Sequence, residues 1–364
     1  MNLNHYGWDE YFAAKMEAYS SEHPEQALIY GRVCSHIKGL YEVMTEKGKV
    51  LASLAGKMLY HFPAEQRPVV GDWVVLAKKA SGDTGDSIIY HTIERKNKVA
   101  RKMAGQKVEE QLMAANIDYV LIVSSLNQEL NMRRFERYLA LVWESGAQPV
   151  IILNKTDLCE EVEQKLYEVE VIAPGVDIHP ISARCDDNLD VLKPYFAAGT
   201  TCALVGSSGV GKSSIINKLC RREMLAVGDI REKDGRGRHI TTHRELFLLP
   251  GGGIIIDTPG MREVGLTNVE EGVKHSFEDI EELARACRFK DCKHQTEPGC
   301  AVQAAIEQGS LDGKRLDNYL KMMSEVEFYQ LREKHSSDYI KKQKWKEVAK
   351  WQKEIKKNNS GVKT

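Results

Sequence analysis

Two nucleotide-binding motifs occur in this chain in an inverted order. Residues 206–213 read Gly-Ser-Ser-Gly-Val-Gly-Lys-Ser, which is a complete phosphate-binding loop. The tetrad Asn154-Lys-Thr-Asp157 matches the motif with which GTPases read guanine, yet it precedes the phosphate loop instead of following it. A GTPase domain that uses both motifs must therefore connect its strands in a circularly permuted order.

The phosphate loop follows an apolar run at residues 201–205, which predicts a buried strand and then a turn into a helix. Backbone N–H groups in such a turn point at phosphate oxygens, at the positive end of the helix dipole. Lys212 is expected to reach the β- and γ-phosphates, and the Ser213 hydroxyl to bind Mg²⁺. The predicted phosphate contacts are Gly206, Ser207, Ser208, Gly209, Val210, Gly211, Lys212, Ser213 and Ser214.

The tetrad predicts which base is bound. The Asp157 carboxylate can accept two hydrogen bonds from guanine, from N1–H and from the exocyclic amine, which adenine does not offer. GTP or GDP is therefore the expected ligand, because an adenine would leave buried polar groups unpaired. Asn154 is expected to brace the loops, and the Ala183 N–H to meet guanine O6. The predicted base contacts are Asn154, Lys155, Thr156, Asp157, Ser182 and Ala183.

The motif Asp257-Thr-Pro-Gly260 follows another apolar run, which places Asp257 at the carboxyl end of a strand. Asp257 can hold Mg²⁺ through water, and the Gly260 N–H can sense the γ-phosphate. Residues 235–243 form a polar segment that suits a switch loop, with a plain basic loop as the alternative.

Catalytic groups are predicted from that switch segment. Thr241 or Thr242 could bind Mg²⁺, alongside the catalytic role of Lys212. Met261 occupies the position where Ras-like proteins place the glutamine that orients water. Intrinsic hydrolysis is therefore expected to be slow, or to depend on another group such as His239.

The length of 364 residues allows two or three domains. Short β-favouring runs at residues 27–33, 71–76 and 87–93 predict a small barrel of about five strands, of either oligonucleotide-binding or SH3-like type. From residue 118 apolar strands alternate with helices, which indicates a doubly wound sheet. The expected regions are an N-terminal extension (1–26), the barrel (27–105), a permuted P-loop GTPase domain (106–270) and a helical zinc-binding domain with a basic tail (271–364).

A metal site is predicted in the last region. Cys287, Cys292, His294 and Cys300 supply three thiolates and one imidazole within a short span, a set that closes tetrahedrally around structural Zn²⁺. The alternative is four unrelated buried residues. No run of about 18 apolar residues is present, so a cytoplasmic protein without a membrane partner is expected.

Overall attraction to nucleic acid is not expected, because the formal net charge is −1. The alternative is that nucleic acid binds to local basic patches. Residues 332–364 carry eleven Lys or Arg against four Asp or Glu, with two tryptophans interleaved, which suits RNA phosphates and bases or else a solvated helix. Residues 95–102 offer a second basic patch.

The motif order, the barrel and the Cys/His cluster together resemble the bacterial family of ribosome small subunit-dependent GTPase A (RsgA, also called YjeQ). Further stretches carry the resemblance, namely residues 95–101, 115–118, 134–139, 251–262 and 297–302. The resemblance implies an oligonucleotide-binding barrel, a circularly permuted GTPase and a zinc domain. Members of the family carry His-Thr-Thr-Thr in the switch, whereas His239 here is followed by Ile240.

The resemblance also implies a function. Such proteins bind the small ribosomal subunit and its rRNA late in maturation, hydrolyse GTP slowly alone and faster on the subunit, and help release assembly factors. A monomer is expected. The alternative is a GTP-gated RNA-binding placeholder whose role needs no turnover. A P-loop kinase is disfavoured by the guanine-reading tetrad at residues 154–157.

Overall fold

The computed structural model describes residues 2–24, 28–37, 39–61, 66–78, 87–102, 110–127, 130–220, 244–257 and 269–334. The chain divides into two compact units. Unit 1 comprises residues 1–101, 111–264 and 271–278, and unit 2 comprises residues 102–110, 265–270 and 279–364. The described part of the chain contains no helix with both the length and the apolar character needed to cross a membrane.

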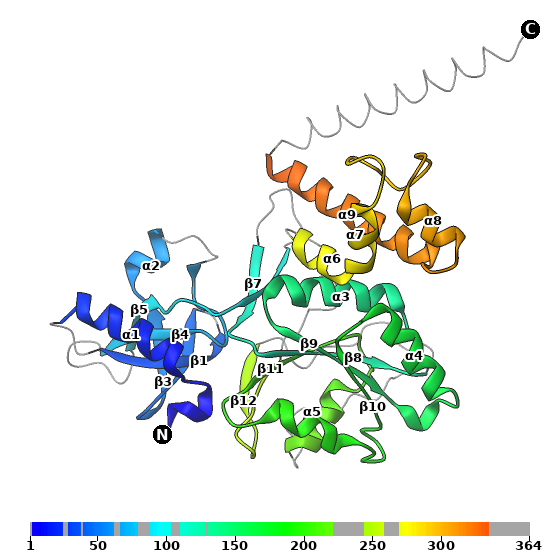
Figure 1. Cartoon of the computed structure of the whole chain (residues 1–364). Helices are drawn as coiled ribbons and strands as arrows, with labels where there is room; N and C mark the ends of the chain where they lie inside the picture. Colours follow the sequence, from blue (N-terminus) through cyan, green and yellow to red (C-terminus); the bar gives the residue numbers. More distant parts are fainter. Residues whose placement is uncertain are drawn as a thin grey trace, which may run out of the picture. The chain divides into compact units, whose positions relative to one another are not determined.

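Five strands near the N-terminus form a closed barrel, which confirms the predicted β-barrel (Figure 1). Neighbouring strands follow the order β1-β2-β3-β5-β4, and pairing of β1 with β4 closes the ring. Alternate side chains fill its interior, among them Val33, Val43, Val74 and Ile89. The strands are β1 (Ile29–Ile37), β2 (Leu40–Thr45), β3 (Gly48–Leu54), β4 (Trp73–Lys78) and β5 (Ser87–Thr92), with helix α2 (Gly56–His61) after β3.

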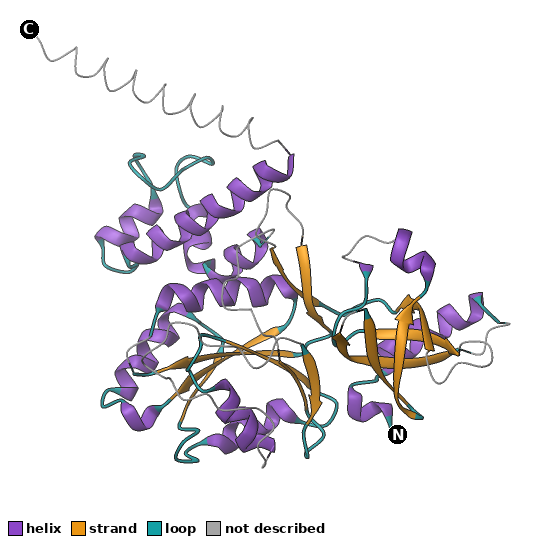
Figure 2. Ribbon diagram, turned by 180° about the vertical axis from the view of Figure 1, so that it is seen from behind, coloured by secondary structure: helices purple, strands orange, loops and turns teal. Residues whose placement is uncertain are grey.

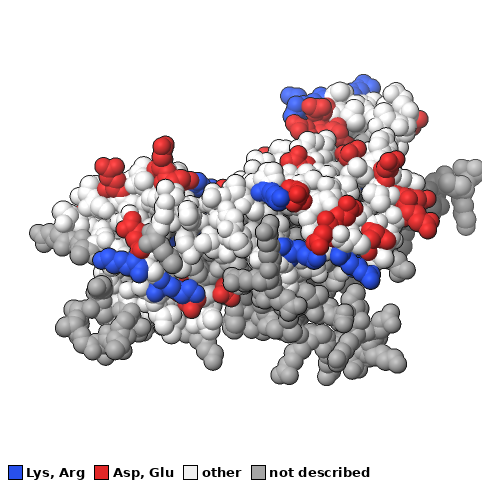
Figure 3. Space-filling model, turned by 90° about the horizontal axis from the view of Figure 1, so that it is seen from below, with Lys and Arg blue, Asp and Glu red and all other residues white. Residues whose placement is uncertain are grey.

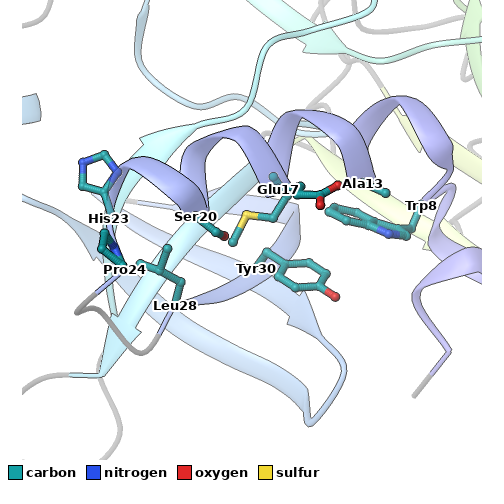
Figure 4. Close-up of a pocket in the computed structure, with 9 residues that line it drawn as sticks. Trp8, Ala13, Glu17, Ser20, His23, Pro24, Leu28 and Tyr30 are labelled. Carbon is teal, nitrogen blue, oxygen red and sulfur yellow. The ribbon is translucent and has the colours of Figure 1, made fainter.

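The N-terminal extension is folded onto this barrel. It contains the 3-10 turn η1 (Leu3–Tyr6) and helix α1 (Glu10–Glu22), whose first turn is capped by the Asp9 side chain. Phe12 and Met16, one helical turn apart, are buried in the core. Trp8 stacks on Tyr30 of β1 with 4.4 Å between ring centroids (Figure 4). The sequence of this segment predicts no function, although a capping Asp before an i, i+4 apolar pair is a helix signal.

A buried arginine joins three parts of unit 1. Arg32 of β1 is only 1% exposed. Its guanidinium donates hydrogen bonds to the carbonyls of Tyr6 (2.6 Å), Gly71 (3.0 Å) and Asn116 (2.9 Å), and to the Thr201 hydroxyl (2.9 Å). Burial lowers the pKa of Arg32 to about 10, so the side chain still carries its charge at neutral pH. Arg32 therefore connects the N-terminal segment, the barrel and the strand before the phosphate loop through hydrogen bonds.

The second half of the large sheet is the predicted doubly wound sheet. Its order is β10-β9-β8-β11-β13-β12, parallel except for β12, which runs antiparallel at the barrel end. Among the described residues, the pair of Ser35 with Glu245 joins β12 to β1 of the barrel. The strands are β8 (Tyr119–Ser125), β9 (Gln148–Asn154), β10 (Asp177–Ile181), β11 (Thr201–Val205), β12 (Glu245–Leu248) and β13 (Ile254–Asp257).

Helices cover both faces of this sheet (Figure 2). Helices α3 and α4 pack on one hydrophobic core, and η4 and α5 on the other. The segment at residues 189–196 is a 3-10 helix with Pro194 inside it. The elements are α3 (Met132–Ser145), η3 (Thr156–Leu158), α4 (Val162–Ile172), η4 (Leu189–Phe196) and α5 (Lys212–Cys220).

The C-terminal region is helical, as predicted. The first of its helices belongs to unit 1, where the Gly272 N–H donates to Glu144 of α3 at 2.9 Å and His275 stacks on Trp143. Within unit 2, Arg315 of α9 forms an ion pair with Asp279 at 2.7 Å. The remaining elements are a two-stranded sheet of β6 (Lys98–Lys102) and β7 (Glu110–Ala115), and helices α6 (Glu270–Ser276), α7 (Glu278–Arg285), α8 (Ala301–Glu307) and α9 (Gly313–Lys334).

Two residues of the expected basic patch at residues 95–102 form ion pairs within the chain. Arg95 donates two hydrogen bonds of 2.8 Å to the carboxylate of Asp72, whose side chain is fully buried. Lys96 forms an ion pair with Asp9 and lies over the Phe12 ring. On the face seen in Figure 3, acidic and basic side chains are interspersed. Arg95 is therefore paired inside the fold and adds little to a basic surface. The expected basic patch at residues 95–102 as a whole stays a prediction.

These two ion pairs should differ in their effect on stability. Arg95→Ala leaves a carboxylate buried without its partner, which we expect to lower the free energy of unfolding by about 3–5 kcal/mol. Lys96→Ala removes a half-exposed pair and should cost less than about 1 kcal/mol. Denaturant unfolding followed by tryptophan fluorescence measures both. Equal effects of the two substitutions would contradict this account of Asp72.

Candidate functional site

The phosphate loop lies where the sequence predicts it, between the fully buried strand β11 and helix α5. Gly206 has φ of +138°, and a Cβ there would lie 2.1 Å from the Val123 carbonyl oxygen of β8. No other residue fits, because a side chain would push β11 away from β8. The loop is thus held against the neighbouring strand while its backbone remains available to a ligand.

Lys212 reaches back over the loop. Its Nζ donates to the carbonyl oxygens of Gly206 at 2.8 Å and Ser207 at 2.6 Å. An ammonium group held above a turn of this kind stands where it can bind phosphate oxygens. Ser213 and Ser214 follow in the first turn of α5 and are partly exposed. Their position at a helix N-terminus suits anion binding and a Mg²⁺ ligand.

Asn154 connects three loops that are distant in the sequence. The side chain is 2% exposed and lies at the end of β9. Its Nδ2 donates to the Val210 carbonyl at 2.8 Å, and its Oδ1 accepts from the Ala183 N–H at 3.0 Å. A Cβ at Gly211 would lie 2.1 Å from Nδ2, so the glycine allows this approach. The side chain bridges the phosphate loop and the loop at 182–183, as the sequence predicts for a bracing residue.

Asp157 is exposed and oriented by a neighbouring hydroxyl. The buried Ser182 donates through Oγ to Asp157 Oδ1 at 2.6 Å, and that hydroxyl accepts from the Cys185 N–H at 3.2 Å. Lys155, just before, has φ of +67°, a left-handed conformation that is uncommon for a residue with a side chain. This arrangement leaves carboxylate lone pairs of Asp157 directed to solvent, where two donors on one edge of a base could bind.

Several predicted residues fall outside the described part of the chain, namely His239, Thr241, Thr242, Gly260 and Met261. For Asp257 the structure describes the backbone, which ends β13 opposite Leu204 of β11. The predicted roles of these residues therefore stay predictions. The basic tail at residues 335–364 likewise lies outside the described residues.

One residue at the site was missed by sequence reasoning. Arg134, in the first turn of α3, donates through Nη1 to the Ser207 hydroxyl of the phosphate loop. The two residues are 73 positions apart, so no local pattern connects them. Only the packing of α3 against β8 and β9 in the folded protein reveals the contact.

The Cys/His cluster is assembled as predicted. One ligand atom from each of the four residues lies within 4.8 Å of the others. The sulfurs of Cys287 and Cys300 are 3.8 Å apart, and His294 Nδ1 lies 3.6 Å and 3.5 Å from them. Tetrahedral Zn²⁺ with bonds of about 2.3 Å to sulfur and about 2.0 Å to nitrogen separates these atoms by about 3.8 and about 3.5 Å. The donor set and its spacing fit that ion.

The loop that carries two of these ligands is held by a carboxylate. Glu297 accepts hydrogen bonds from the N–H groups of Lys293, Gln295 and Thr296 at 2.9–3.0 Å. These backbone donors lower the pKa of Glu297 to about 2. His294 is further positioned by Gln303, whose side-chain amide donates to the His294 carbonyl at 2.5 Å. The ligands therefore stand on an ordered loop.

Comparisons with known proteins agree with this geometry. The family model described as "RsgA GTPase" matches residues 92–267. The small ribosomal subunit biogenesis GTPase RsgA 2 of Vibrio parahaemolyticus is 43% identical over 90% of this chain and 86% of its own length. The small ribosomal subunit biogenesis GTPase RsgA of Methanosarcina acetivorans is 39% identical over 96% of this chain and 92% of its own length.

Solved structures show the same architecture. The crystal structure of YjeQ from Thermotoga maritima covers 82% of this chain and 98% of its own, with a TM-score of 0.62 and 29% identity. YloQ, described as a circularly permuted GTPase, covers 84% of this chain and 97% of its own, with a TM-score of 0.58 and 25% identity. The inverted motif order thus has a structural precedent.

Removal of the Asn154 amide should damage the site without changing any residue expected to contact phosphate. In Asn154→Ala the Val210 carbonyl and Ala183 N–H lose their partners, and we expect guanine-nucleotide affinity to fall about tenfold or more. Titration with a fluorescent GDP analogue measures the change. Gln164→Ala, on the exposed side of α4, serves as the control. Unchanged GDP affinity in Asn154→Ala would refute the bracing role.

Proposed function

Because this chain belongs to the RsgA GTPase family, we propose that it hydrolyses GTP to GDP and phosphate in the service of small ribosomal subunit maturation. Intrinsic hydrolysis is slow, and the small subunit stimulates it. Hydrolysis then times departure of the protein from the subunit. The protein acts as a cytoplasmic monomer whose partners are GTP, the subunit with its rRNA, and assembly factors.

The observation that carries this proposal is the convergence on Asn154. Its side chain joins the base-reading tetrad, the phosphate loop and the loop at 182–183 through two hydrogen bonds. A pocket for one nucleotide needs a base reader and a phosphate binder at a defined separation. The Asn154 bridge supports that separation, and the Ser182 hydroxyl holds the Asp157 carboxylate that would accept from the base.

Each predicted residue then receives a role. Lys212 would stabilise negative charge on the β- and γ-phosphates, and Ser213 and Asp257 would hold the Mg²⁺ that accompanies GTP. Thr241 or Thr242 completes the metal coordination, and Gly260 senses the γ-phosphate. His239 orients the attacking water, since Met261 has no group that can do so. The bound Mg²⁺ neutralises charge on the phosphates.

RNA contact is assigned to the basic tail and the barrel. Residues 332–364 carry a clear excess of Lys and Arg, which favours binding to rRNA phosphates. The regional division made from the sequence, into extension, barrel, permuted GTPase domain and zinc-binding domain, is retained as part of this proposal. The Cys/His cluster holds one structural Zn²⁺ that shapes the C-terminal domain.

GTP turnover with and without small subunits tests the enzyme against the placeholder alternative. We expect a slow rate for the protein alone and an increase of tenfold or more, roughly, when purified small subunits are added. Subunit binding should weaken as salt concentration rises, because phosphate contacts release counterions. Turnover that the subunit fails to stimulate, with binding intact, would favour the placeholder.

A substitution at Asp157 tests the selection of the base. Asp157→Asn replaces an acceptor by a group that can donate, so GTP affinity should fall by about a hundredfold, the scale set by leaving base donors unpaired. Xanthine carries a carbonyl in place of the guanine amine, and XTP should therefore bind the variant better than GTP does. Wild-type GTP affinity in Asp157→Asn would contradict the assigned base reader.

Zinc removal should affect structure before chemistry. A chelator is expected to release about one Zn²⁺ per chain and to unfold the segment around residues 287–300, since binding and folding of such sites are coupled. Circular dichroism and metal analysis measure this, and Cys292→Ser should reproduce it. GDP affinity should persist, because the nucleotide loops belong to unit 1. A protein isolated without metal yet fully folded would contradict the zinc assignment.

A further inference from the structure

Two cationic side chains converge on one residue of the phosphate loop. Lys212 Nζ lies 2.6 Å from the carbonyl oxygen of Ser207, and the Arg134 guanidinium donates to the hydroxyl of the same serine. They approach from different elements, Lys212 from α5 and Arg134 from α3. Two cations held close together repel each other, and both are attracted to an anion that binds between them. The loop therefore presents more positive charge than its own lysine supplies.

The position of Arg134 follows from the start of α3. The helix begins after Asn131, whose side chain accepts from the Arg134 backbone N–H at 3.2 Å. Helical side chains lean toward the helix N-terminus, so the Arg134 side chain leaves the first turn in the direction of the loop. Arg133, one residue earlier, points about 100° away around the helix axis. Both arginines are exposed, but the phosphate-loop contact belongs to Arg134.

We propose that Arg134 is a catalytic arginine supplied in cis, which contacts the phosphates of bound GTP and stabilises the charge that develops on them during hydrolysis. This inference rests on the proposed GTPase function. A water oxygen bonds to the γ-phosphorus as the bond from that phosphorus to the bridging oxygen breaks, and GDP leaves with the electron pair. The proton lost by water passes to solvent or phosphate. The planar guanidinium offers paired donors to two oxygens during this step.

The role differs from that of the residues already assigned. Lys212 and Mg²⁺ bind the phosphates in the ground state as well as in the transition state. The Arg134 guanidinium donates to the neutral hydroxyl of Ser207, the second residue of the loop, and a charged phosphate oxygen is a stronger acceptor for the same donor. Arg134 should therefore act mainly on the rate of the chemical step, as arginines that stabilise this transition state do elsewhere.

The test uses the full-length protein in single-turnover GTP hydrolysis, with and without small subunits. Arg134→Ala should slow hydrolysis about a hundredfold or more, while GDP affinity changes by less than about threefold. Arg134→Lys should be intermediate, because lysine keeps the charge but loses the planar fork. The Arg134→Ala protein should also fail to form the GDP–fluoroaluminate complex that mimics the transition state, which a merely structural residue would not prevent.

Arg133→Ala is the matched control, since it removes the same charge from the same helical turn and should hydrolyse GTP at the wild-type rate. Hydrolysis by Arg134→Ala at the rate of Arg133→Ala, or a normal fluoroaluminate complex in Arg134→Ala, would overturn the proposal. Equal losses of GDP and GTP affinity with an unchanged rate of the chemical step would also overturn it. A wild-type protein that does not hydrolyse GTP would instead refute the proposed function itself.

Discussion

The geometry of the nucleotide site depends on one buried amide. Asn154 has a donor and an acceptor on a single rigid group, and it uses the donor on Val210 and the acceptor on Ala183. Neither oxygen nor nitrogen could be exchanged without leaving a buried backbone group unpaired. The separation between base reader and phosphate loop is therefore set by the dimensions of an asparagine side chain. Gly211 is required for the same reason, since a side chain there would occupy the space of the amide.

Permutation of the chain leaves this site unaffected because parallel strands, not chain order, bring the loops together. β11 pairs with β8 on one side and with β13 on the other, so the segments after all three strands meet at one edge of the sheet. Permutation changes which other segments of the chain lie next to the site. Arg32 ties the start of β11 to the barrel and to the N-terminal segment, and Ser35 pairs with Glu245 next to the expected switch. The barrel is thus built into the framework that positions the nucleotide loops.

Local patterns predicted the strands well because the parallel strands are buried on both faces and read as uninterrupted apolar runs. They predicted the Cys/His cluster because four residues with one shared chemistry lie close in sequence. They did not predict helix α1, whose polar composition hides two core residues, nor the winding of η4 around Pro194. The partners of Arg95 and Lys96 were not predicted, since composition records charge but not the carboxylates that Asp72 and Asp9 provide.

By itself the sequence determined the expected ligand chemistry, because phosphate binding, guanine recognition and tetrahedral metal binding each require particular residue types at short, fixed spacings. Only the tertiary structure decided which distant residues share a site. The contact of Arg134 with Ser207 and the burial of Arg32 depend on how helices and strands pack, and packing joins positions through space without leaving a pattern along the chain.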